Sequence, residues 1–266
     1  MITSTSNPHI KAIRKLSDVN ERAVTGNFLA EGLRVVGQAF ESHAEIVEFI
    51  YSAELLISEY GQKLLEEAKN AEIPITPVSA SVFESLARKD KPQGVAALIR
   101  QNWQHLSTFA SLQSGILIAL EAVQNPGNLG TILRTCDAVA AKGLILLDHS
   151  TDPYDPIAVK ASMGAIFTVP VFRSNYEDLK VFLENNPKLI AIGTSDKASP
   201  TVFEAIYPNP LLLIMGSERE GLSDKYAQLC RFMVRIPMLG ACDSLNLSVA
   251  TGVTLYQVYH QHNIKA

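Results

Sequence analysis

Three short segments in the C-terminal half of the chain bring polar side chains to positions just after apolar runs. The first segment holds Asn128 and Arg134, the second holds Glu218, and the third holds Ser244 and Asn246. Together they supply a guanidinium, a carboxylate, two amides and a hydroxyl, which are groups that can hold and orient a polar ligand. Each residue also has a structural interpretation, as a helix cap or as a solvated loop side chain.

The first segment, "EAVQNPGNLGTILRTCDAVA" from Glu121, has the pattern of a strand end, a turn at "QNPG" and a helix. Asn128 can cap this helix. Arg134 lies off the apolar face, and Gly130, one turn earlier, would leave space above it because helical side chains lean towards the preceding turn. The loop contains neither GxGxxG nor GxxxxGKS/T, which disfavours a dinucleotide fingerprint.

The second and third segments follow the last two apolar runs. Glu218 comes two residues after Gly216, where a strand is expected to end, and Gly221 provides a turn before the next helix. The third segment, "DSLNLSVATGVTLYQV", begins the final helix and offers four polar side chains where a helix start needs one cap. Asn246 or Ser248 can be that cap, which leaves the other polar groups for a ligand.

Six apolar, β-rich runs follow Gly115, and helical segments separate most of them. This pattern indicates an α/β domain with a parallel sheet that is buried on both faces. Ligands of such sheets bind in the loops at the carboxyl ends of the strands, so the three polar segments lie where a site is expected. The runs are "GILIALEAV", "GLILLD", "FTVPVF", "LIAIGTS", "LLLIMGS" and "RFMVRIP".

Residues 1–100 alternate short helices and strands, which predicts a smaller, separate α/β domain. Residues 101–114 are polar and weakly periodic and are expected to form a linker to the domain of residues 115–266. Trp103, in this linker, is expected to pack against one domain. In the first domain, helices are expected at 8–16, from about 33, at 58–72 and at 82–89, and strands at "GNFLAEG", "IVEFIYS", "PITPVS" and "GVAALIR".

The composition is that of an ordinary folded protein, with 47% hydrophobic and 19% charged residues. A net charge of −4 gives no overall support for nucleic-acid binding, so a basic face must come from particular residues. The three scattered cysteines predict free thiols in a reducing cytosol and no metal site. The sequence shows no signal peptide and no apolar run of membrane-spanning length, so a cytoplasmic protein without a membrane association is expected.

In their order along the chain, the three segments resemble the motifs of the SpoU (TrmH-like) family of RNA ribose 2′-O-methyltransferases, within the SPOUT superfamily. The first motif, Asn-x(5)-Arg, matches Asn128 and Arg134. The second, Gly-x-Glu-x-x-Gly-Leu, matches residues 216–222. The third, Ile-Pro-Met followed by Ser-Leu-Asn-x-Ser-x-Ala, matches residues 236–238 and 244–250. The N-terminal "SNPHIKAIRKL" and "GNFLAEGLRVV" are more loosely similar to the substrate-binding domain of many such enzymes.

The resemblance implies a C-terminal parallel sheet with a deep trefoil knot, and an N-terminal domain like ribosomal protein L30e that binds the substrate. Knots are rare, so the knot rests on the resemblance alone. The cofactor S-adenosyl-L-methionine is expected in the knot, where backbone groups of three loops would hold it. The matching positions are Thr194, Gly216, Ile236, Met238 and Leu245.

The implied reaction is methyl transfer to a ribose 2′-hydroxyl of RNA, with Arg134 as the residue that activates the hydroxyl. Because the pKa of arginine is above about 12, a second hypothesis gives Arg134 an electrostatic role towards a phosphate and the developing alkoxide. Asn128, Glu218 and Asn246 are expected to position Arg134 and the ribose. Ser244 is expected to form a hydrogen bond near the cofactor or Arg134.

The resemblance also implies an RNA partner and a homodimer that forms through the C-terminal domain. In the last helix, Val253, Tyr256 and Tyr259 could contribute to a dimer interface or pack in the core. The run of basic residues in the N-terminal domain could meet RNA phosphates or form a solvated helical face. These residues are Lys11, Arg14, Lys15, Arg22 and Arg34.

The two-domain layout resembles that of the ribosomal-RNA enzymes of the family more than that of its compact tRNA enzymes, which favours ribosomal RNA as the substrate. Three alternatives stay open. The first is 2′-O-methylation of tRNA. The second is a non-catalytic RNA-binding regulator on the same fold, which the presence of Arg134, Glu218, Ser244 and Asn246 opposes. The third is a doubly wound enzyme acting on a nucleotide or sugar, which lacks a glycine fingerprint and leaves the third segment unexplained.

Overall fold

The protein was analysed as a computed structural model that describes residues 1–87, 91–109 and 111–264. The chain forms two compact units. The first contains Met1–Gln101 and Asp152–Phe167, and the second contains Asn102–Thr151 and Thr168–Ala266. The segment 152–167, which is expected from the sequence in the C-terminal domain, therefore packs in the first unit.

The first unit is built on a four-stranded mixed sheet in the order β1-β4-β2-β3. Strand β4 pairs antiparallel with β1 and with β2, whereas β2 and β3 run parallel. Each strand coincides with a predicted one. The strands are β1 (Asn27–Glu31), β2 (Ile46–Tyr51), β3 (Ile75–Pro77) and β4 (Val95–Arg100).

The predicted helices of this unit are also present, with boundaries set by their caps. Helix α1 (Pro8–Lys15) begins with a proline in its first turn, and the Asn7 side chain caps it by accepting a hydrogen bond from the His9 N–H at 2.9 Å. It packs beside α5 (Ala80–Leu86), which covers most of the helix predicted at 82–89; residues 88 and 89 lie outside the described part. The others are α3 (Leu33–Glu41) and α4 (Glu59–Asn70).

One further helix, α2 (Val19–Thr25), was not expected from the sequence because it is short and has no regular apolar stripe. Its ends nevertheless carry local signals. The Asp18 side chain caps the start by accepting from the Asn20 N–H at 2.7 Å, and Gly26 closes the end with a φ of +67°. The spacing of Asp18 and Glu21 is that of a capping box.

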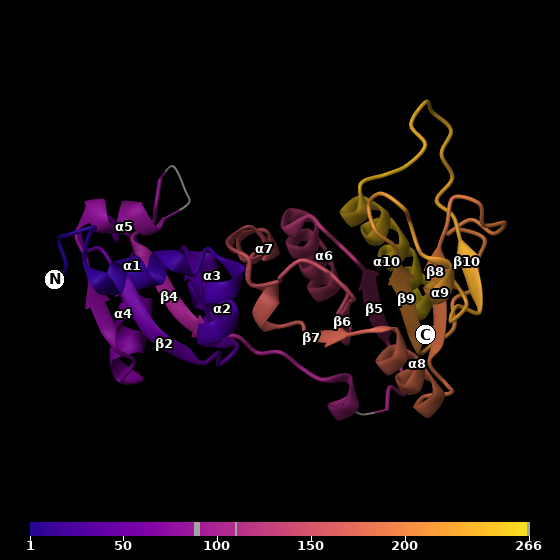
Figure 1. Cartoon of the computed structure of the whole chain (residues 1–266), viewed down its shortest axis with the longest axis horizontal. Helices are drawn as coiled ribbons and strands as arrows, with labels where there is room; N and C mark the ends of the chain where they lie inside the picture. Colours follow the sequence, from indigo (N-terminus) through magenta and orange to yellow (C-terminus); the bar gives the residue numbers. More distant parts are fainter. Residues whose placement is uncertain (88–90, 110, 265–266) are drawn as a thin grey trace. The chain divides into compact units, whose positions relative to one another are not determined.

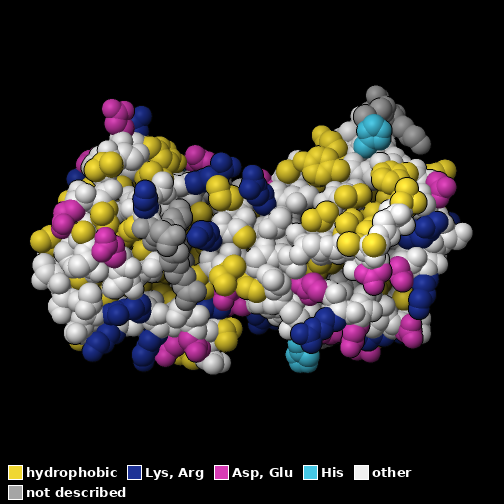
Figure 2. Space-filling model, turned by 90° about the horizontal axis from the view of Figure 1, so that it is seen from above, with side chains coloured by type: hydrophobic (Ala, Val, Ile, Leu, Met, Phe, Trp, Pro, Cys, Tyr) yellow, Lys and Arg dark blue, Asp and Glu magenta, His cyan; other side chains and the backbone are white. Residues whose placement is uncertain are grey.

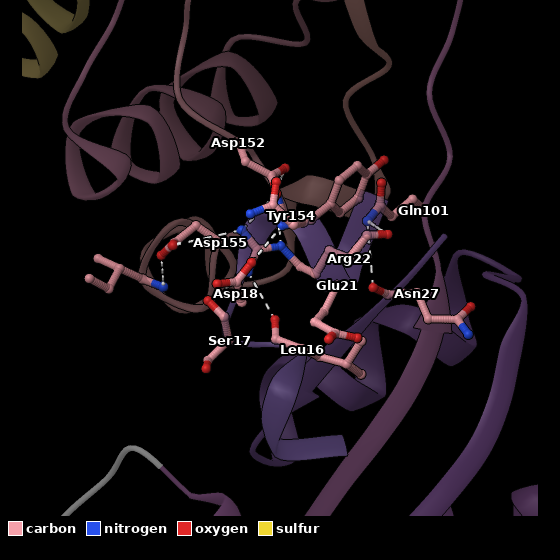
Figure 3. Close-up of polar contacts among 12 residues, drawn as sticks. Leu16, Ser17, Asp18, Glu21, Arg22, Asn27, Gln101, Asp152, Tyr154 and Asp155 are labelled. Atoms are coloured by element: carbon pink, nitrogen blue, oxygen red, sulfur yellow. Dashed lines mark hydrogen bonds and ion pairs between the residues drawn. The ribbon is translucent and has the colours of Figure 1, made fainter. Parts of the chain in front are cut away.

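A buried arginine on α2 holds the segment 152–167 within the first unit (Figure 3). Arg22 is only 1% exposed. Its Nε and Nη2 atoms each lie 2.7 Å from Oδ2 of Asp152, and Nη1 donates to the carbonyls of Leu16 and Ser17 at 2.9 and 3.0 Å. The guanidinium therefore joins the turn between α1 and α2 to the start of the segment 152–167.

Aromatic packing completes this attachment. Phe28 of β1 is buried against Tyr154 and Phe167, with ring centroids 4.8 and 6.1 Å apart. The helix α7 (Pro156–Ser162) lies between these two aromatic residues in the chain, and Phe167 ends the short 3-10 helix η2 (Ala165–Phe167). Helix α7 contacts β1, so the segment covers one part of the first unit's sheet.

The second unit contains a six-stranded sheet in the order β10-β8-β9-β5-β6-β7, and every neighbouring pair is parallel. All six predicted runs form strands, so the prediction of an α/β fold with a parallel sheet is confirmed. The strands are β5 (Ile116–Glu121), β6 (Gly143–Leu147), β7 (Val171–Ser174), β8 (Ile190–Thr194), β9 (Leu211–Met215) and β10 (Phe232–Val234).

Helices cover the faces of this sheet (Figure 1). Helix α6 (Pro126–Ala138) packs against α10 (Leu247–Ile264). Helix α8 (Tyr176–Asn185) buries Leu179 and Phe182 in a core that also includes alternate residues of β5, β6 and β9. A shorter helix, α9 (Asp224–Ala227), follows β9. None of the helices in the described ranges combines the length and apolar character that a membrane span needs.

The segment expected to be a linker is docked on the second unit. Gln104 pairs with Phe172 of β7, and Leu106, in the 3-10 helix η1 (Leu106–Thr108), is buried in the core beside α8. The guanidinium of Arg173 lies over the Trp103 ring at 4.0 Å, so Trp103 packs against one unit as expected. Residue 110, within the predicted linker, lies outside the described residues.

The burial of Arg22 leads to a prediction about stability. Replacing Arg22 by Ala should lower the free energy of unfolding by about 3–5 kcal/mol, because it leaves the carboxylate of Asp152 without its partner. Arg100→Ala is the matched control, since the Arg100–Glu45 ion pair is exposed and should contribute about 1 kcal/mol or less. Chemical denaturation of the full chain measures both values, and equal losses for the two variants would contradict the structural role of Arg22.

Candidate active site

The candidate site is assembled at the carboxyl ends of four adjacent strands. In the sheet order, β10, β8, β9 and β5 are consecutive neighbours and all run in the same direction. Asn128 follows β5, Glu218 follows β9, Thr194 ends β8, and Ile236 follows β10. The parallel arrangement therefore places residues that are up to about a hundred positions apart at the same edge of the sheet.

The loop that carries Glu218 is closed tightly on itself. Ser217 and Gly221 exchange two backbone hydrogen bonds of 3.0 and 3.2 Å. A Cβ atom on Gly216 would lie only 1.9 Å from the carbonyl carbon of Gly221 and 2.0 Å from the nitrogen of Leu222, so only glycine fits at position 216. This close approach holds Glu218 just beyond the end of β9.

A hydrogen-bonded relay joins the three polar segments. The Asn128 Nδ2 donates to Oε1 of Glu218 at 3.1 Å, and the Asn246 Nδ2 donates to Oδ1 of Asn128 at 3.0 Å. The Oδ1 of Asn246 accepts from the backbone N–H and the hydroxyl of Ser248 at 2.9 and 2.7 Å. Because the relay begins at an acceptor-only carboxylate and ends at a donor-only N–H, the orientation of both amides is determined.

Backbone groups hold the carboxylate of Glu218 as well. The N–H groups of Gln124 and Asn125 donate to its two oxygens at 3.2 and 3.3 Å. On the other side of the loop, the buried carboxylate of Glu121 accepts from the Ser223 N–H at 2.8 Å. The ends of β5 and β9 are therefore connected by carboxylate hydrogen bonds in both directions.

The capping assignments differ in one case from those expected. Asn128 does not cap α6; Asn125 does, by accepting hydrogen bonds from the N–H groups of Gly127 and Asn128 at 2.8 and 3.2 Å. The sequence contained this signal, because Asn125 immediately precedes a proline that occupies the first helical position. Asn246 caps α10, which is one of the two possibilities expected, and the amide of Asn128 is left for the relay.

Arg134 and Ser244 lie outside the relay. Arg134 is exposed on α6 and, among the described residues, makes no hydrogen bond or ion pair. Ser244 is also exposed and donates to Oδ1 of the neighbouring Asp243 at 3.3 Å. Arg134 is therefore available to a ligand, and the structure gives it no direct contact with Asn128, Glu218 or Asn246.

The five expected cofactor positions surround the carboxyl ends of β8, β9 and β10. Gly216 is buried, Thr194, Ile236 and Met238 are half-buried, and Leu245 is exposed. The Thr194 hydroxyl contacts Sδ of Met215 at 3.7 Å. Within the described part of the chain, the backbone N–H and C=O groups of residues 236–245 form no hydrogen bond with other protein groups. They can therefore bind a ligand through the backbone.

The RNA-binding candidates of the first unit differ in how accessible they are. Lys11 and Arg34 are exposed, and Arg34 donates to the Met163 carbonyl at 3.3 Å. Arg14 is half-buried and donates to the Thr5 carbonyl. Arg22 is buried and forms hydrogen bonds with Asp152 and with two carbonyls, so it is not accessible to a phosphate.

The hydrogen bonds to Glu218 predict a dependence of stability on pH. Partial burial raises the pKa of Glu218, but hydrogen bonds from Asn128, from its own N–H and from the N–H groups of Gln124 and Asn125 outweigh this, so the pKa lies below its usual value of 4.5. A lowered pKa means that the carboxylate stabilises the fold above pH 4.5, and that this contribution disappears as the pH falls through the lowered value.

Glu218→Gln should therefore be less stable than the unmodified chain at pH 7, and the difference should shrink below about pH 4.5. Thermal unfolding between pH 7 and pH 3.5 measures the difference. Glu220→Gln is the control, because the side chain of Glu220 accepts no hydrogen bond among the described residues. A constant difference between Glu218→Gln and the unmodified chain over this range would contradict the prediction.

Comparison with known proteins shows similarity along the whole chain. One relative is a 23S rRNA (uridine(2479)-2′-O)-methyltransferase of Streptomyces viridochromogenes, and the two sequences are 28% identical over 251 residues. The match covers 92% of this chain and 87% of the relative. A second relative is the 23S rRNA (guanosine-2′-O-)-methyltransferase RlmB of Haemophilus influenzae, with 34% identity. That match covers 75% of this chain and 84% of the relative. The AdoMet-bound crystal structure of an rRNA methyltransferase from Sinorhizobium meliloti superposes with a TM-score of 0.89 and 32% identity, covering 98% and 97% of the two chains.

Two family models match separate parts of the sequence. The MRM3-like substrate binding domain matches residues 7–97, and the SpoU rRNA Methylase family matches residues 115–256, which contain every residue of the relay. The second match spans more than half of the chain. Together with the relatives, it shows that the chain belongs to the SpoU rRNA methylase family.

Proposed function

We propose that this protein transfers a methyl group from S-adenosyl-L-methionine to a ribose 2′-hydroxyl of ribosomal RNA. The observation that carries the proposal is the relay from Glu218 through Asn128 to Asn246, which joins the three motif segments. The exposed Arg134 lies on the same helix as Asn128. The names of the relatives support this reaction, since they describe 2′-O-methyltransferases of 23S ribosomal RNA. A match over 92% of the chain, including the first unit, favours ribosomal RNA over tRNA.

The residues at the carboxyl ends of β8, β9 and β10 fit the cofactor. When bound, S-adenosyl-L-methionine supplies a methyl group on a positively charged sulfur. The backbone groups of residues 236–245 have no protein partners among the described residues, so they can pair with the edge of an adenine. Ile236, Met238 and Leu245 can provide apolar walls, Gly216 permits close approach of the backbone, and Thr194 adds a hydroxyl.

We assign Arg134 an electrostatic role. A guanidinium carries donors and no acceptor, so it is a poor acceptor for the proton of a hydroxyl. It can instead hold a phosphate of the RNA through two parallel hydrogen bonds and stabilise the negative charge that develops on the attacking oxygen. In this step the new O–C bond replaces the S–C bond of the cofactor, and the hydroxyl proton passes to solvent water. Asn128, Glu218 and Asn246 would then position the ribose, and Ser244 would bind near the cofactor.

The trefoil knot and the L30e-like fold of the first unit are further parts of this proposal. The chain leaves the edge strand β10 and returns to α6, which follows β5, before it forms α10. To do so it must cross the loops that follow β8 and β9, and passage beneath one of them would form the knot. The match of residues 7–97 to a substrate-binding domain supports RNA binding by the first unit.

We also propose that the protein is cytoplasmic, which agrees with its three free cysteines. We further propose a homodimer that forms through α10. Tyr256 and Tyr259 are 52% and 39% exposed, Val249 is 50% exposed, and the two tyrosine rings pack edge to face. Val253 is half-buried. Such exposure of large side chains on one helix favours a protein interface.

Removing the guanidinium tests the catalytic proposal. Arg134→Ala should lower kcat for methyl transfer to ribosomal RNA by about a hundredfold or more. Its affinity for S-adenosyl-L-methionine, measured by calorimetry, should stay within about twofold. Arg134→Lys keeps the charge but loses the forked geometry and should also be impaired.

Arg231→Ala is the control for these variants, because Arg231 is exposed at the opposite, amino end of β10. Near-normal turnover of Arg134→Lys would exclude the two parallel hydrogen bonds from Arg134 to a phosphate. A large loss of cofactor affinity in Arg134→Ala would move Arg134 to the cofactor site.

The dimer is tested by sedimentation at micromolar concentration. The unmodified chain should sediment as a dimer, and the double variant Tyr256→Glu/Tyr259→Glu should sediment as a monomer because burial of two carboxylates is unfavourable. A monomer for the unmodified chain, or a dimer for the double variant, would reject an interface on this face of α10.

A further inference from the structure

The first unit contains a pocket of about 840 Å³ that is separate from the motif residues. Parts of α1, α2, β1, α5 and α7 line it. Its floor is apolar and includes the buried side chains of Ile13, Leu16, Leu86 and Val159. A pocket of this volume is large enough for a nucleotide, and an apolar floor suits the face of a nucleobase.

The pocket wall carries both cations and carboxylates, and two of its cations, Arg14 and Lys160, are free to meet an anionic group of a ligand. Its three carboxylates already have partners: Asp18 caps α2, Glu21 lies 3.6 Å from Lys15, and Glu31 is also engaged. In contrast, Arg14 and Lys160 form no ion pair with any described residue. Arg14 donates one hydrogen bond, to the Thr5 carbonyl, and its Nε finds no acceptor in the described structure.

The buried Arg22 fixes one wall of this pocket through the polar contacts that Figure 3 shows. Its hydrogen bonds hold the carbonyls of Leu16 and Ser17 on one side and the carboxylate of Asp152 on the other. Leu16 and Ser17 line the pocket, and Asp152 directly precedes the turn into α7, which contributes Lys160. The pocket is therefore a built feature of the first unit, held by an ion pair whose guanidinium is buried.

A row of cations leads along α1 to the pocket. Lys11, Arg14 and Lys15 are spaced at i, i+3 and i+4, so they share one side of the helix. Arg14 and Lys15 line the pocket, and Lys15 also pairs with Glu21 at 3.6 Å. Figure 2 shows Lys and Arg side chains next to hydrophobic ones on the visible face of the first unit. A row of this kind suits consecutive phosphates of a strand rather than the single phosphate of a free nucleotide.

We propose that this pocket binds one unstacked nucleotide of the substrate RNA, at a position other than the nucleotide that is methylated. The base would lie on the apolar floor, and its phosphate would contact Arg14 and Lys160. The proposal rests on the proposed function, because an RNA substrate is what brings a nucleotide strand to the first unit. It assigns Arg22 to building the pocket, and Arg14 and Lys160 to contacting RNA.

Substitutions that change the charge of residues lining the pocket test this assignment in the whole chain. The variants are Lys160→Glu and Arg14→Gln, with Lys63→Glu as the control, since Lys63 is exposed on α4 of the same unit and forms no ion pair among the described residues. The probe is 23S ribosomal RNA transcribed in vitro, and its Kd is measured by filter binding over a series of salt concentrations. Melting curves and the calorimetric Kd for S-adenosyl-L-methionine verify the fold of each variant.

The Kd for RNA should rise about tenfold in Lys160→Glu and in Arg14→Gln, and stay within about twofold in Lys63→Glu. The slope of log Kd against log salt concentration should decrease in magnitude by about 0.7 for each lost phosphate contact, which a purely structural role would not produce. Equal effects of Lys160→Glu and Lys63→Glu would overturn the proposal.

Two further measurements complete the test. The first shows whether the pocket binds a nucleotide of an RNA strand or a free nucleotide, and the second tests methyl transfer separately from the role of the pocket. A 5′-nucleoside monophosphate that binds at micromolar concentration, with RNA affinity unchanged in Lys160→Glu, would reassign the pocket to a free nucleotide and overturn the RNA assignment. Methyl transfer by the unmodified protein is measured in parallel. Its absence would reject the proposed function, whereas the pocket is judged by the RNA affinities of the variants in either case.

Discussion

The parallel direction of all six strands in the second unit is the constraint on which the site depends. Every strand enters the sheet at one edge and leaves it at the other, so the segments after β5, β8, β9 and β10 must emerge together. These strands are adjacent in the sheet although they are not consecutive in the chain. The arrangement brings Asn128 within hydrogen-bond distance of both Glu218 and Asn246.

The site has two parts: the relay residues, which protein contacts hold in place, and the guanidinium of Arg134, which has no partner among the described residues. Glu218 accepts hydrogen bonds from two backbone N–H groups and from an amide, and Gly216 packs against the backbone of the same loop. These contacts hold the relay without help from a ligand. Arg134 forms no hydrogen bond or ion pair among the described residues, which leaves its guanidinium available to a ligand. Electrostatic stabilisation of a transition state requires polar groups that are held in place before the reaction.

Much of this organisation was predictable from local sequence patterns. Apolar runs of strand length gave all six strands of the second sheet, and the three polar segments were correctly expected at their carboxyl ends. The capping role of Asn128 was wrong because Asn125, three residues earlier and next to Pro126, is the better cap. The relay was not predictable, since it depends on strand order, which the pattern along a single chain does not contain.

The first unit shows a similar limit. Arg22 was expected to contact RNA because it lies in a basic run, but it is buried by an ion pair with Asp152, 130 positions away. No periodicity within α2 could reveal that partner. The same interaction explains why Asp152–Phe167 packs in the first unit although its sequence lies between two strands of the second. Tertiary contacts of this kind decide which cations of a basic run are available to a ligand.

The central claim, methylation of ribosomal RNA, is tested most directly by mapping 2′-O-methylated nucleotides in 23S ribosomal RNA by mass spectrometry. The RNA should come from cells with the gene, from cells without it, and from cells in which it has been restored. We expect one 2′-O-methylated nucleotide that is present with the gene, absent without it and recovered on restoration. Identical methylation maps from the three strains would contradict the account.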